Sequence, residues 1–234
     1  MNTVGVILAA GSGSRTGLST PKQFLPLGGK TGLEHSVQTF NDHPGIDQVV
    51  IVTATEFIDK VQELIKANNW NKVTAVLPGG KERYDSSLAA VRYFSDRPDL
   101  VMLFHDAARP LVSEHIITDT LNAMEKYNAV DVAIPAVDTI VQCDAQGTVM
   151  ESIQDRNLLW RMQTPQGFRQ KTIQEAYRIA LKDKKFTATD DCGTVLRYLP
   201  DEKVGIVRGS ERNVKLTYAD DISLLDFLLS HPER

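Results

Sequence analysis

Clusters of glycines, cations and hydroxyl-bearing residues follow four runs of the chain that are typical of β-strands. The clusters are Leu8-Ala-Ala-Gly-Ser-Gly-Ser-Arg15 with Pro21-Lys-Gln23, Gly79-Gly-Lys-Glu-Arg-Tyr-Asp-Ser86, His105-Asp-Ala-Ala-Arg-Pro110 and Asn213-Val-Lys-Leu-Thr217. Small residues let backbone N–H groups approach a phosphate closely, and cations beside them add attraction. The cations in these clusters include Arg15, Lys22, Arg83, Arg109 and Lys215. Cations gathered with glycines favour a polyphosphate ligand, and a nucleoside triphosphate fits them better than a protein partner.

The first cluster matches neither of the two familiar phosphate-binding motifs. The dinucleotide fingerprint G-x-G-x-x-G fits Gly11 and Gly13, but Thr16 stands where the third glycine is needed. The Gly-Lys-Ser/Thr sequence of the Walker loop is absent. A nicotinamide-dependent oxidoreductase is therefore a distant alternative, and binding of NADH would identify it.

Some of these residues also have a purely structural interpretation. Residues 85–86 are of types that cap helices. Asp106 ends a strand, where a carboxylate can hold a metal ion or a ribose hydroxyl, whereas His105 is expected to be a packed strand residue. Adjacent carboxylates on a helix point about 100° apart. Asp190 and Asp191 are therefore expected to complement a helix N-terminus rather than to share a metal ion.

Alternating strands and helices must position these clusters. Short apolar or β-branched runs predict strands at residues 4–10, 48–52, 73–77, 100–105, 130–135 and 203–207. Helical spacing predicts helices at 34–40, 56–68, 84–94, 113–127, 170–181, 189–199 and 219–229, with Ser113 as an N-cap. This order predicts an α/β fold, a Rossmann-like open and mostly parallel sheet with helices on both faces. In such sheets ligands bind outside the carboxyl ends of the strands, which is where the clusters fall.

One segment interrupts the alternation. Residues 138–143 and 148–153 are short β-like runs on either side of Asp144-Ala-Gln-Gly147, which predicts a β-hairpin. A ribbon that projects from the domain leaves apolar groups exposed unless something covers them, and self-association is one answer. We therefore expect a single domain over residues 1–234, with a β-arm at about 136–158.

Composition excludes several classes of protein. The 234 residues contain 26 Lys and Arg against 30 Asp and Glu, a net charge of -4 that argues against a general nucleic-acid binder. Cys143 and Cys192 fit no disulfide framework or zinc spacing. The first residues do not resemble a signal peptide, and no stretch approaches the roughly 18 apolar residues of a membrane helix. These features predict a cytoplasmic protein with no membrane or nucleic-acid partner.

Taken in order, the clusters resemble those of the 2-C-methyl-D-erythritol 4-phosphate cytidylyltransferase family, from about Val4 to about Leu229. The matching set also includes Asp155-Arg-Asn-Leu-Leu-Trp160 and Gln163-Thr-Pro-Gln166. One departure is Thr16, where the family usually has Met. The resemblance implies that CTP and a sugar-alcohol phosphate give a CDP-alcohol and pyrophosphate. A phosphate monoester is largely dianionic at neutral pH, so it needs no catalytic base to attack the α-phosphorus.

The resemblance also implies roles for individual residues. Arg15 and Lys22 match the catalytic pair at the α-phosphate, and Arg156 and Lys215 match residues that position the acceptor phosphate. Arg109 and Thr139 match further acceptor contacts. The nucleotide-binding residues implied are Leu8, Ala9, Ala10, Gly11, Gly80, Arg83, Ser86 and Asp106. A magnesium ion, or another divalent cation, would neutralise the triphosphate, with Asp106 as the protein residue beside it.

Two further expectations follow from the family. Its projecting hairpin crosses to a second subunit, so the resemblance implies a homodimer in which Thr139 and Arg156 serve the partner's site. Related enzymes use ribitol 5-phosphate for cell-wall or capsule polymers. Ala108 and the Asp155–Trp160 pattern favour methylerythritol phosphate, whereas the segment 126–141 is much like that of the ribitol group. Ribitol 5-phosphate therefore stays an open alternative as the acceptor.

Overall fold

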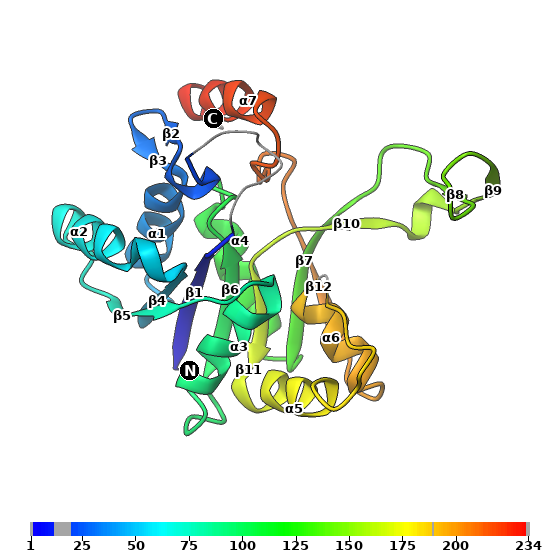
Figure 1. The fold of residues 1–234 in the computed structure, drawn as a ribbon, viewed down its shortest axis with the longest axis horizontal. Helices are drawn as coiled ribbons and strands as arrows, with labels where there is room; N and C mark the ends of the chain where they lie inside the picture. Colours follow the sequence, from blue (N-terminus) through cyan, green and yellow to red (C-terminus); the bar gives the residue numbers. More distant parts are fainter. Residues whose placement is uncertain (1, 12–19, 189, 233–234) are drawn as a thin grey trace.

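An eight-stranded mixed sheet forms the centre of the computed structural model, which describes residues 2–11, 20–188 and 190–232 (Figure 1). Its strands run in the order β10-β7-β11-β6-β1-β4-β5, and β12 pairs with β7 as well. They span Thr3–Ala9 (β1), Gln48–Thr53 (β4), Val73–Pro78 (β5), Val101–Asp106 (β6), Ala129–Pro135 (β7), Trp160–Met162 (β10), Gln166–Arg169 (β11) and Val204–Arg208 (β12).

Most neighbouring strands are parallel, as the alternation of strands and helices predicts. β4 and β6 flank β1 in parallel, β5 continues parallel beyond β4, and β12 lies parallel to β7. β10 runs antiparallel to β7, and β11 lies between β6 and β7 and runs antiparallel to both. These two strands were not predicted, because each has only three or four residues, too few for a periodic pattern to identify. Pairing with longer strands on both sides makes β11 part of the sheet.

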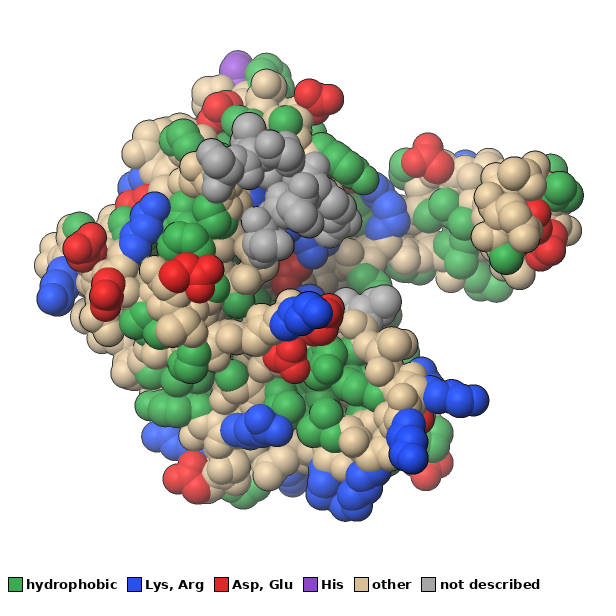
Figure 2. Space-filling view, viewed as in Figure 1, with side chains coloured by type: hydrophobic (Ala, Val, Ile, Leu, Met, Phe, Trp, Pro, Cys, Tyr) green, Lys and Arg blue, Asp and Glu red, His purple; other side chains and the backbone are tan. Residues whose placement is uncertain are grey.

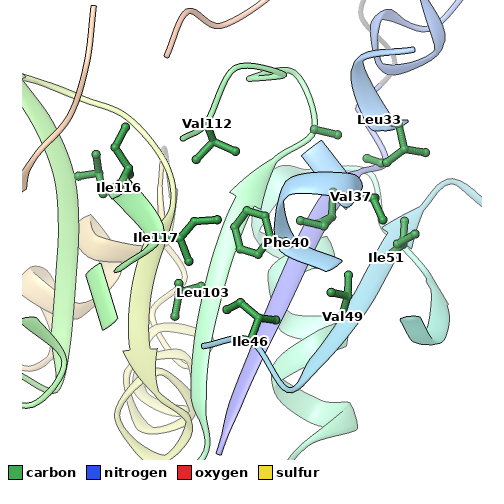
Figure 3. Close-up of a cluster of buried hydrophobic side chains, with 14 of the residues drawn as sticks. Leu33, Val37, Phe40, Ile46, Val49, Ile51, Leu103, Val112, Ile116 and Ile117 are labelled. Atoms are coloured by element: carbon green, nitrogen blue, oxygen red, sulfur yellow. The ribbon is translucent and has the colours of Figure 1, made fainter. Parts of the chain in front are cut away.

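Helices cover both faces of the sheet, which confirms the predicted α/β architecture. One face is covered by α1 (Gly32–Asp42), α2 (Ile58–Asn68) and α4 (Glu114–Ala123), and the other by α3 (Arg83–Tyr93), α5 (Gln170–Ala180) and α6 (Asp191–Tyr198). Successive strand side chains point to opposite faces. Ile7 of β1 therefore packs on the α1–α4 side and Val6 on the α3–α5 side. Figure 3 shows α1 and α4 meeting over β4 and β6 in the first of these cores.

Local sequence signals set the ends of several helices. Ser113 is the N-cap of α4, as predicted, and its hydroxyl accepts a hydrogen bond from the N–H of Ile116 at 3.3 Å. Thr31 caps α1 in the same way and also binds the carboxylate of Glu34, which forms a capping box. The last helix, α7 (Asp220–Ser230), packs Leu225 against a separate apolar cluster beside the short hairpin of β2 (Pro26–Leu27) and β3 (Lys30–Thr31). In the described part of the chain no helix is long and apolar enough to cross a membrane.

The predicted hairpin is present and stands away from the sheet (Figure 1). β8 (Val141–Cys143) pairs antiparallel with β9 (Met150–Ile153), so both strands are shorter than predicted. The carboxylate of Asp144 closes the turn by accepting the N–H groups of Thr148 and Val149 at 2.8 and 2.9 Å. Hydrophobic side chains lie on the surface of this arm, as Figure 2 shows. The exposed ones are Val137, Ile140, Val141, Val149, Met150, Ile153 and Leu158.

Candidate functional site

A cavity of about 300 Å³ opens at the carboxyl ends of β1 and β6, in the size range of small-molecule sites. The predicted clusters meet there, although they are far apart in the sequence. Residues proposed from the sequence line most of the wall: Leu8, Ala9, Ala10, Gly11, Lys22, Gly80, Arg83, Ser86, Asp106 and Lys215. Gln23, Lys81, Glu82 and Ala108 also line it and were not assigned to the site. Arg15 lies outside the described residues, so its catalytic role stays a prediction.

A buried hydrogen bond holds the segment that carries Lys22 beside the end of β1. Lys22 opens a short 3-10 helix, Lys22–Phe24, whose other two residues are buried. The side-chain amide of Gln23 donates to the carbonyl of Ala9 at 2.7 Å. Gln23 is 2 % exposed, so this hydrogen bond is shielded from water. The contact fastens the segment that carries Lys22 to the first strand. Gln23 therefore positions Lys22, a role that the sequence motif alone did not show.

The second glycine cluster packs tightly against the first. A Cβ at Gly79 would overlap Ala10 and Ser86, and the N–H of Gly79 donates to the carbonyl of Thr53 at 2.7 Å. At Gly80 a Cβ would overlap the side chain of Asp85. The N-cap of α3 is Glu82 rather than either of residues 85–86, and Asp85 completes a capping box by accepting the N–H of Glu82 at 3.0 Å. The glycines therefore allow a close approach of two loops, and Ser86 is left as a buried hydroxyl in the cavity wall.

Asp106 is the electrostatic centre of the cavity. Its Oδ1 lies 3.1 Å from Nε of Arg83 and its Oδ2 lies 2.6 Å from Nζ of Lys215. Burial alone would raise the pKa of this carboxyl, but Arg83 and Lys215 outweigh burial and hold the pKa well below its usual range. The carboxylate is therefore ionised at any working pH. Two of the cations expected to bind a polyphosphate, Arg83 and Lys215, are thus partly neutralised in this structure.

A chain of hydrogen bonds behind Asp106 involves His105, which is fully buried, as expected for a packed strand residue. The N–H of Asp106 donates to the hydroxyl of Thr164 at 3.2 Å, and that hydroxyl lies 2.9 Å from Nδ1 of His105. Nε2 of His105 lies 3.0 Å from the carbonyl of Arg109, which can only accept, so Nε2 carries the proton. Burial lowers the pKa of His105 to about 4. A neutral imidazole therefore braces the loop after β6.

Arg109 binds backbone rather than the cavity. Nη1 donates to the carbonyl of Asn213 at 2.6 Å, and Nη2 donates to the carbonyl of Met162 at 3.2 Å. These contacts fasten the loop that carries Lys215 to the end of β10. The expected acceptor contact of Arg109 stays a prediction.

Thr139 and Arg156 lie on or beside the arm. Within the described residues neither lines the cavity of its own chain, and Nη1 of Arg156 donates to the carbonyl of Val137 at 2.9 Å. This placement is compatible with an arm that serves a second subunit. The acceptor roles expected for these two residues stay predictions.

The described residues fit a magnesium ion that is bound together with the nucleotide. Among the described residues, no group of three or more His, Cys, Asp or Glu side chains could hold a metal ion by itself. Mg²⁺ in nucleotide enzymes is commonly held by one or two carboxylates together with substrate phosphates. Asp106 can supply one such carboxylate at the cavity wall, provided that the ion takes up oxygen positions that Arg83 and Lys215 contact here. An ion would therefore arrive with the triphosphate.

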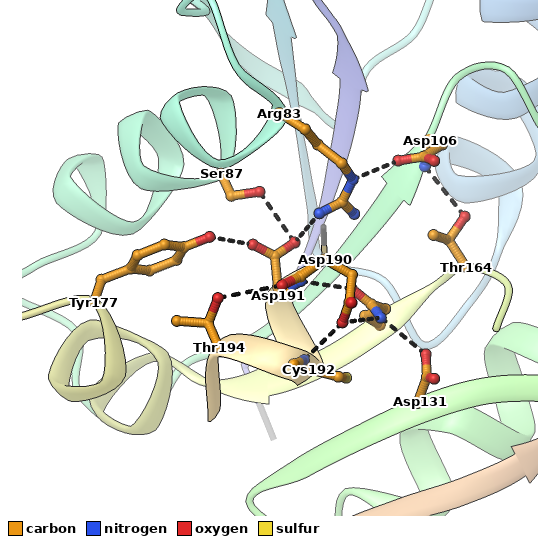
Figure 4. A network of polar contacts seen from close by, with 12 residues as sticks. Arg83, Ser87, Asp106, Asp131, Thr164, Tyr177, Asp190, Asp191, Cys192 and Thr194 are labelled. Atoms are coloured by element: carbon orange, nitrogen blue, oxygen red, sulfur yellow. Dashed lines mark hydrogen bonds and ion pairs between the residues drawn. The ribbon is translucent and has the colours of Figure 1, made fainter. Parts of the chain in front are cut away.

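A second carboxylate holds Arg83 from behind the cavity. Nη1 of Arg83 lies 2.6 Å from Oδ2 of Asp191, whose side chain is completely buried (Figure 4). The neighbouring Asp190 caps α6, as its place at a helix N-terminus predicts, by accepting the N–H of Gly193 at 2.6 Å. The contact of Asp191 with Arg83 was missed, because no spacing rule links residues 108 positions apart.

Comparisons with known proteins agree with these motifs. The model of the family described as IspD, 2-C-methyl-D-erythritol 4-phosphate cytidylyltransferase, matches residues 3–231. The 2-C-methyl-D-erythritol 4-phosphate cytidylyltransferase of Thermobifida fusca is 45% identical over 95% of this chain and 91% of the relative. The bifunctional ribulose 5-phosphate reductase/CDP-ribitol pyrophosphorylase Bcs1 of Haemophilus influenzae is 42% identical over 96% of this chain, which covers 48% of that protein.

Solved structures show the same fold. The crystal structure of 4-diphosphocytidyl-2C-methyl-D-erythritol synthase from Anaerococcus prevotii superposes with a TM-score of 0.86 at 26% identity, covering 98% of this chain and 96% of that one. The cytidylyltransferase structure from Thermus thermophilus has a TM-score of 0.76, also at 26% identity, with 98% of this chain and 100% of that chain covered.

Proposed function

The chain belongs to the 2-C-methyl-D-erythritol 4-phosphate cytidylyltransferase family, and we propose that it joins CTP to 2-C-methyl-D-erythritol 4-phosphate with release of pyrophosphate. The observation that carries this proposal is that the glycine loops, Lys22, Arg83 and Lys215 meet in one cavity. Such a cavity suits two anionic substrates that must be held close together. The chain is a nucleotidyltransferase of isoprenoid precursor synthesis.

The reaction forms one bond and breaks one. An oxygen of the acceptor phosphate attacks the α-phosphorus of CTP, and the bond from that phosphorus to the bridging oxygen of the pyrophosphate breaks. The attacking oxygen is already deprotonated, so no residue needs to act as a base. This agrees with the neutral, buried state of His105. The enzyme has to align the two anions and to stabilise the charge that develops between them.

The described residues divide this work by position. The glycines at residues 79–80 and the backbone of residues 8–11 are small enough to let the nucleotide lie against the wall, with Arg83 and Ser86 beside it. Lys22 stabilises the charge on the α-phosphate, and Lys215 draws in the acceptor phosphate. Mg²⁺, when bound, neutralises the triphosphate and makes the pyrophosphate a better leaving group. Asp106 would hold it together with the triphosphate oxygens.

We also propose that the active form is a homodimer made through the arm. The arm carries exposed apolar side chains on both hairpin strands, which need a cover in solution. Thr139 and Arg156 lie outside their own cavity, so a partner's arm would deliver them to the site.

In this proposal residues 1–234 are one nucleotidyltransferase domain. Both cysteines are free thiols, which suits a cytoplasmic enzyme.

Ribitol 5-phosphate is the second candidate acceptor. The similarity to the CDP-ribitol pyrophosphorylase protein of Haemophilus influenzae, at 42% identity over 96% of this chain, is the observation that favours it. Both acceptors present the same phosphate to Lys215, so the cations cannot distinguish them. The acceptor must be selected by the remainder of the molecule, which differs in chain length and branching.

Pyrophosphate release from CTP with each acceptor tests the proposal. We expect a kcat/KM at least about 100-fold higher with 2-C-methyl-D-erythritol 4-phosphate than with ribitol 5-phosphate, the size of discrimination that a specific hydrogen-bonding site can exceed. NADH and CTP binding are compared in parallel. A preference for ribitol 5-phosphate would support the second candidate acceptor. Binding of NADH without CTP would reject both cytidylyltransferase functions.

A further inference from the structure

Asp191 is a buried carboxylate at the first turn of α6, and its oxygens accept hydrogen bonds from side chains on two other helices. Oδ2 accepts from Nη1 of Arg83 at 2.6 Å and from the hydroxyl of Ser87 at 3.0 Å, both on α3. Oδ1 accepts from the hydroxyl of Tyr177 on α5. Figure 4 shows these groups converging on the carboxylate. Of the four residues only Arg83 lines the cavity.

The backbone of Asp191 is fixed as well. Its N–H donates to the side-chain carbonyl of Gln166 at 3.2 Å, and the amide nitrogen of the same Gln166 donates to Asp131 at 2.9 Å. The carboxylate also lies at a helix N-terminus, where negative charge is favourable. A buried carboxylate is costly unless it is paired and hydrogen-bonded. Here each of these hydrogen-bond partners of Asp191 also restricts where the carboxylate can lie.

Arg83 is held by carboxylates at two edges of its guanidinium. Nη1 binds Asp191 and Nε binds Asp106 at 3.1 Å. Burial alone would lower the pKa of Arg83, but the two carboxylates outweigh burial and raise it, so the group keeps its charge. Because the guanidinium is planar, two contacts on different nitrogens fix its orientation. Nη2 has no hydrogen-bond partner within the part of the chain that the structure describes.

We propose that Asp191 is a positioning residue for nucleotide binding, which acts by holding Arg83 in the orientation that CTP requires. Ser87 and Tyr177 in turn hold Asp191, so three helices fix one cation of the cavity. The inference rests on the proposed function, because that function makes Arg83 a nucleotide contact. It adds residues that do not touch the cavity to those that determine the affinity for CTP.

A double-mutant cycle between Asp191→Asn and Arg83→Ala tests the inference. Asp191→Asn keeps the shape of the side chain and removes its charge. We expect it to raise the KM and the Kd for CTP by about tenfold, the lower end of what a hydrogen bond to a charged group contributes. The KM for the acceptor should change less than about twofold. In the Arg83→Ala background the same change should have no further effect, because coupled residues are not additive.

Tyr177→Phe provides a milder second variant, should Asp191→Asn fail to fold. It removes one donor to Asp191 and keeps the ring, and we expect the KM for CTP to rise by about threefold. The matched control is Tyr198→Phe. Tyr198 also donates to an aspartate, Asp183, and its ring packs on the same Phe186 as that of Tyr177, but it is not connected to Arg83. The control should keep the wild-type KM for CTP.

The outcomes separate the inference from the proposed function. Wild-type protein that forms no CDP-alcohol rejects the function. An active wild type whose Asp191→Asn and Tyr177→Phe variants keep the wild-type KM for CTP, with only a lower melting temperature, overturns the inference alone. Effects of Asp191→Asn and Arg83→Ala that multiply in the double variant overturn it too, since Asp191 would then act independently of Arg83.

Discussion

At the scale of single residues, the site combines cations with carboxylates that hold those cations in place. Asp106 lies between Arg83 and Lys215, and Asp191 holds Arg83 from the opposite side. Preorganised charges stabilise a transition state better than mobile ones, because they need not reorient during the reaction. The carboxylates thus reduce the net charge of the cavity but fix its geometry.

Lys22→Ala tests the catalytic cation on the first loop. The change removes the charge expected at the α-phosphate, and we expect kcat to fall by about 100-fold or more, as when one donor is removed from a preorganised site. The buried anchors Gln23 and Phe24 remain, so the melting temperature should stay near the wild-type value. Pyrophosphate release and thermal unfolding measure the two effects. Lys66→Ala, an exposed change on α2, is the control, and an unchanged kcat in Lys22→Ala would remove Lys22 from the mechanism.

Asp131 provides a pH-dependent test of stability. This carboxyl is buried in β7, and burial together with the nearby Asp190 raises its pKa to about 7, from 3.8 in an unfolded chain. The folded state therefore binds the proton more tightly, and its stability falls as the pH rises from about 4 to about 7. Asn at this position keeps an acceptor for the amide of Gln166 and has no proton to lose.

We expect Asp131→Asn to gain stability relative to wild type as the pH rises, by up to about 4 kcal/mol above pH 7. Urea unfolding at several pH values from 4.5 to roughly 8 measures the difference. Asp201→Asn, at an exposed position, controls for the loss of a negative charge. A difference between Asp131→Asn and wild type that stays constant across this range would contradict the prediction.

At the scale of elements, loops at the ends of strands supply the cavity and the hairpin supplies the surface for association. The glycine pair after β5 is required because its backbone approaches Ala10 and Ser86 closely. The arm is different, because its strands pair only with each other and its apolar side chains are exposed. An isolated hairpin is marginally stable in water, so a partner surface would stabilise it.

Mixing two inactive variants tests whether the arm serves a second subunit. Arg156→Ala and Lys215→Ala should each lower activity strongly. In a heterodimer of the two, one site combines an intact Lys215 with the partner's intact Arg156. After free exchange of subunits, about a quarter of the wild-type activity should therefore return.

The oligomeric state is measured in parallel by light scattering. Ile153→Glu places a charge on the exposed apolar surface of the arm and should convert the dimer to a monomer, whereas Leu196→Glu on α6 should not. A monomeric wild type, or no activity regained on mixing, would contradict the proposal that the arm joins two subunits and completes the partner's site.

At the scale of the whole molecule, the net charge of -4 conceals an uneven distribution. Lys22, Lys81, Arg83 and Lys215 surround one cavity, although acidic residues outnumber basic ones in the chain. Such a local concentration of cations attracts a polyphosphate although the chain as a whole is acidic. Because CTP would bind only the folded state, it should stabilise the entire domain.

CTP should raise the melting temperature in a metal-dependent way. At a CTP concentration about 100 times Kd the folded state gains about 2.7 kcal/mol, which raises the Tm of a domain of this size by about 5–10 °C. Removal of divalent metal with EDTA should abolish most of the shift, since the triphosphate is then not neutralised. Thermal unfolding with magnesium, with EDTA and with sodium chloride of equal ionic strength gives the comparison. Equal shifts with and without EDTA would contradict the metal requirement.

The sequence alone determined the features that depend on neighbouring residues. Apolar periodicity located the long strands and the helices, Ser113 capped α4 as predicted, and the turn at Asp144 closed a hairpin. It also located most of the cavity wall, because polar clusters after parallel strands meet at one edge of a sheet. Only the tertiary structure decided the insertion of β11 between β6 and β7, and the pairing of Arg83 with Asp191 and of Asp106 with Lys215. These partners are 108 and 109 residues apart. The order of strands in the sheet brings them together, and no local pattern encodes that order.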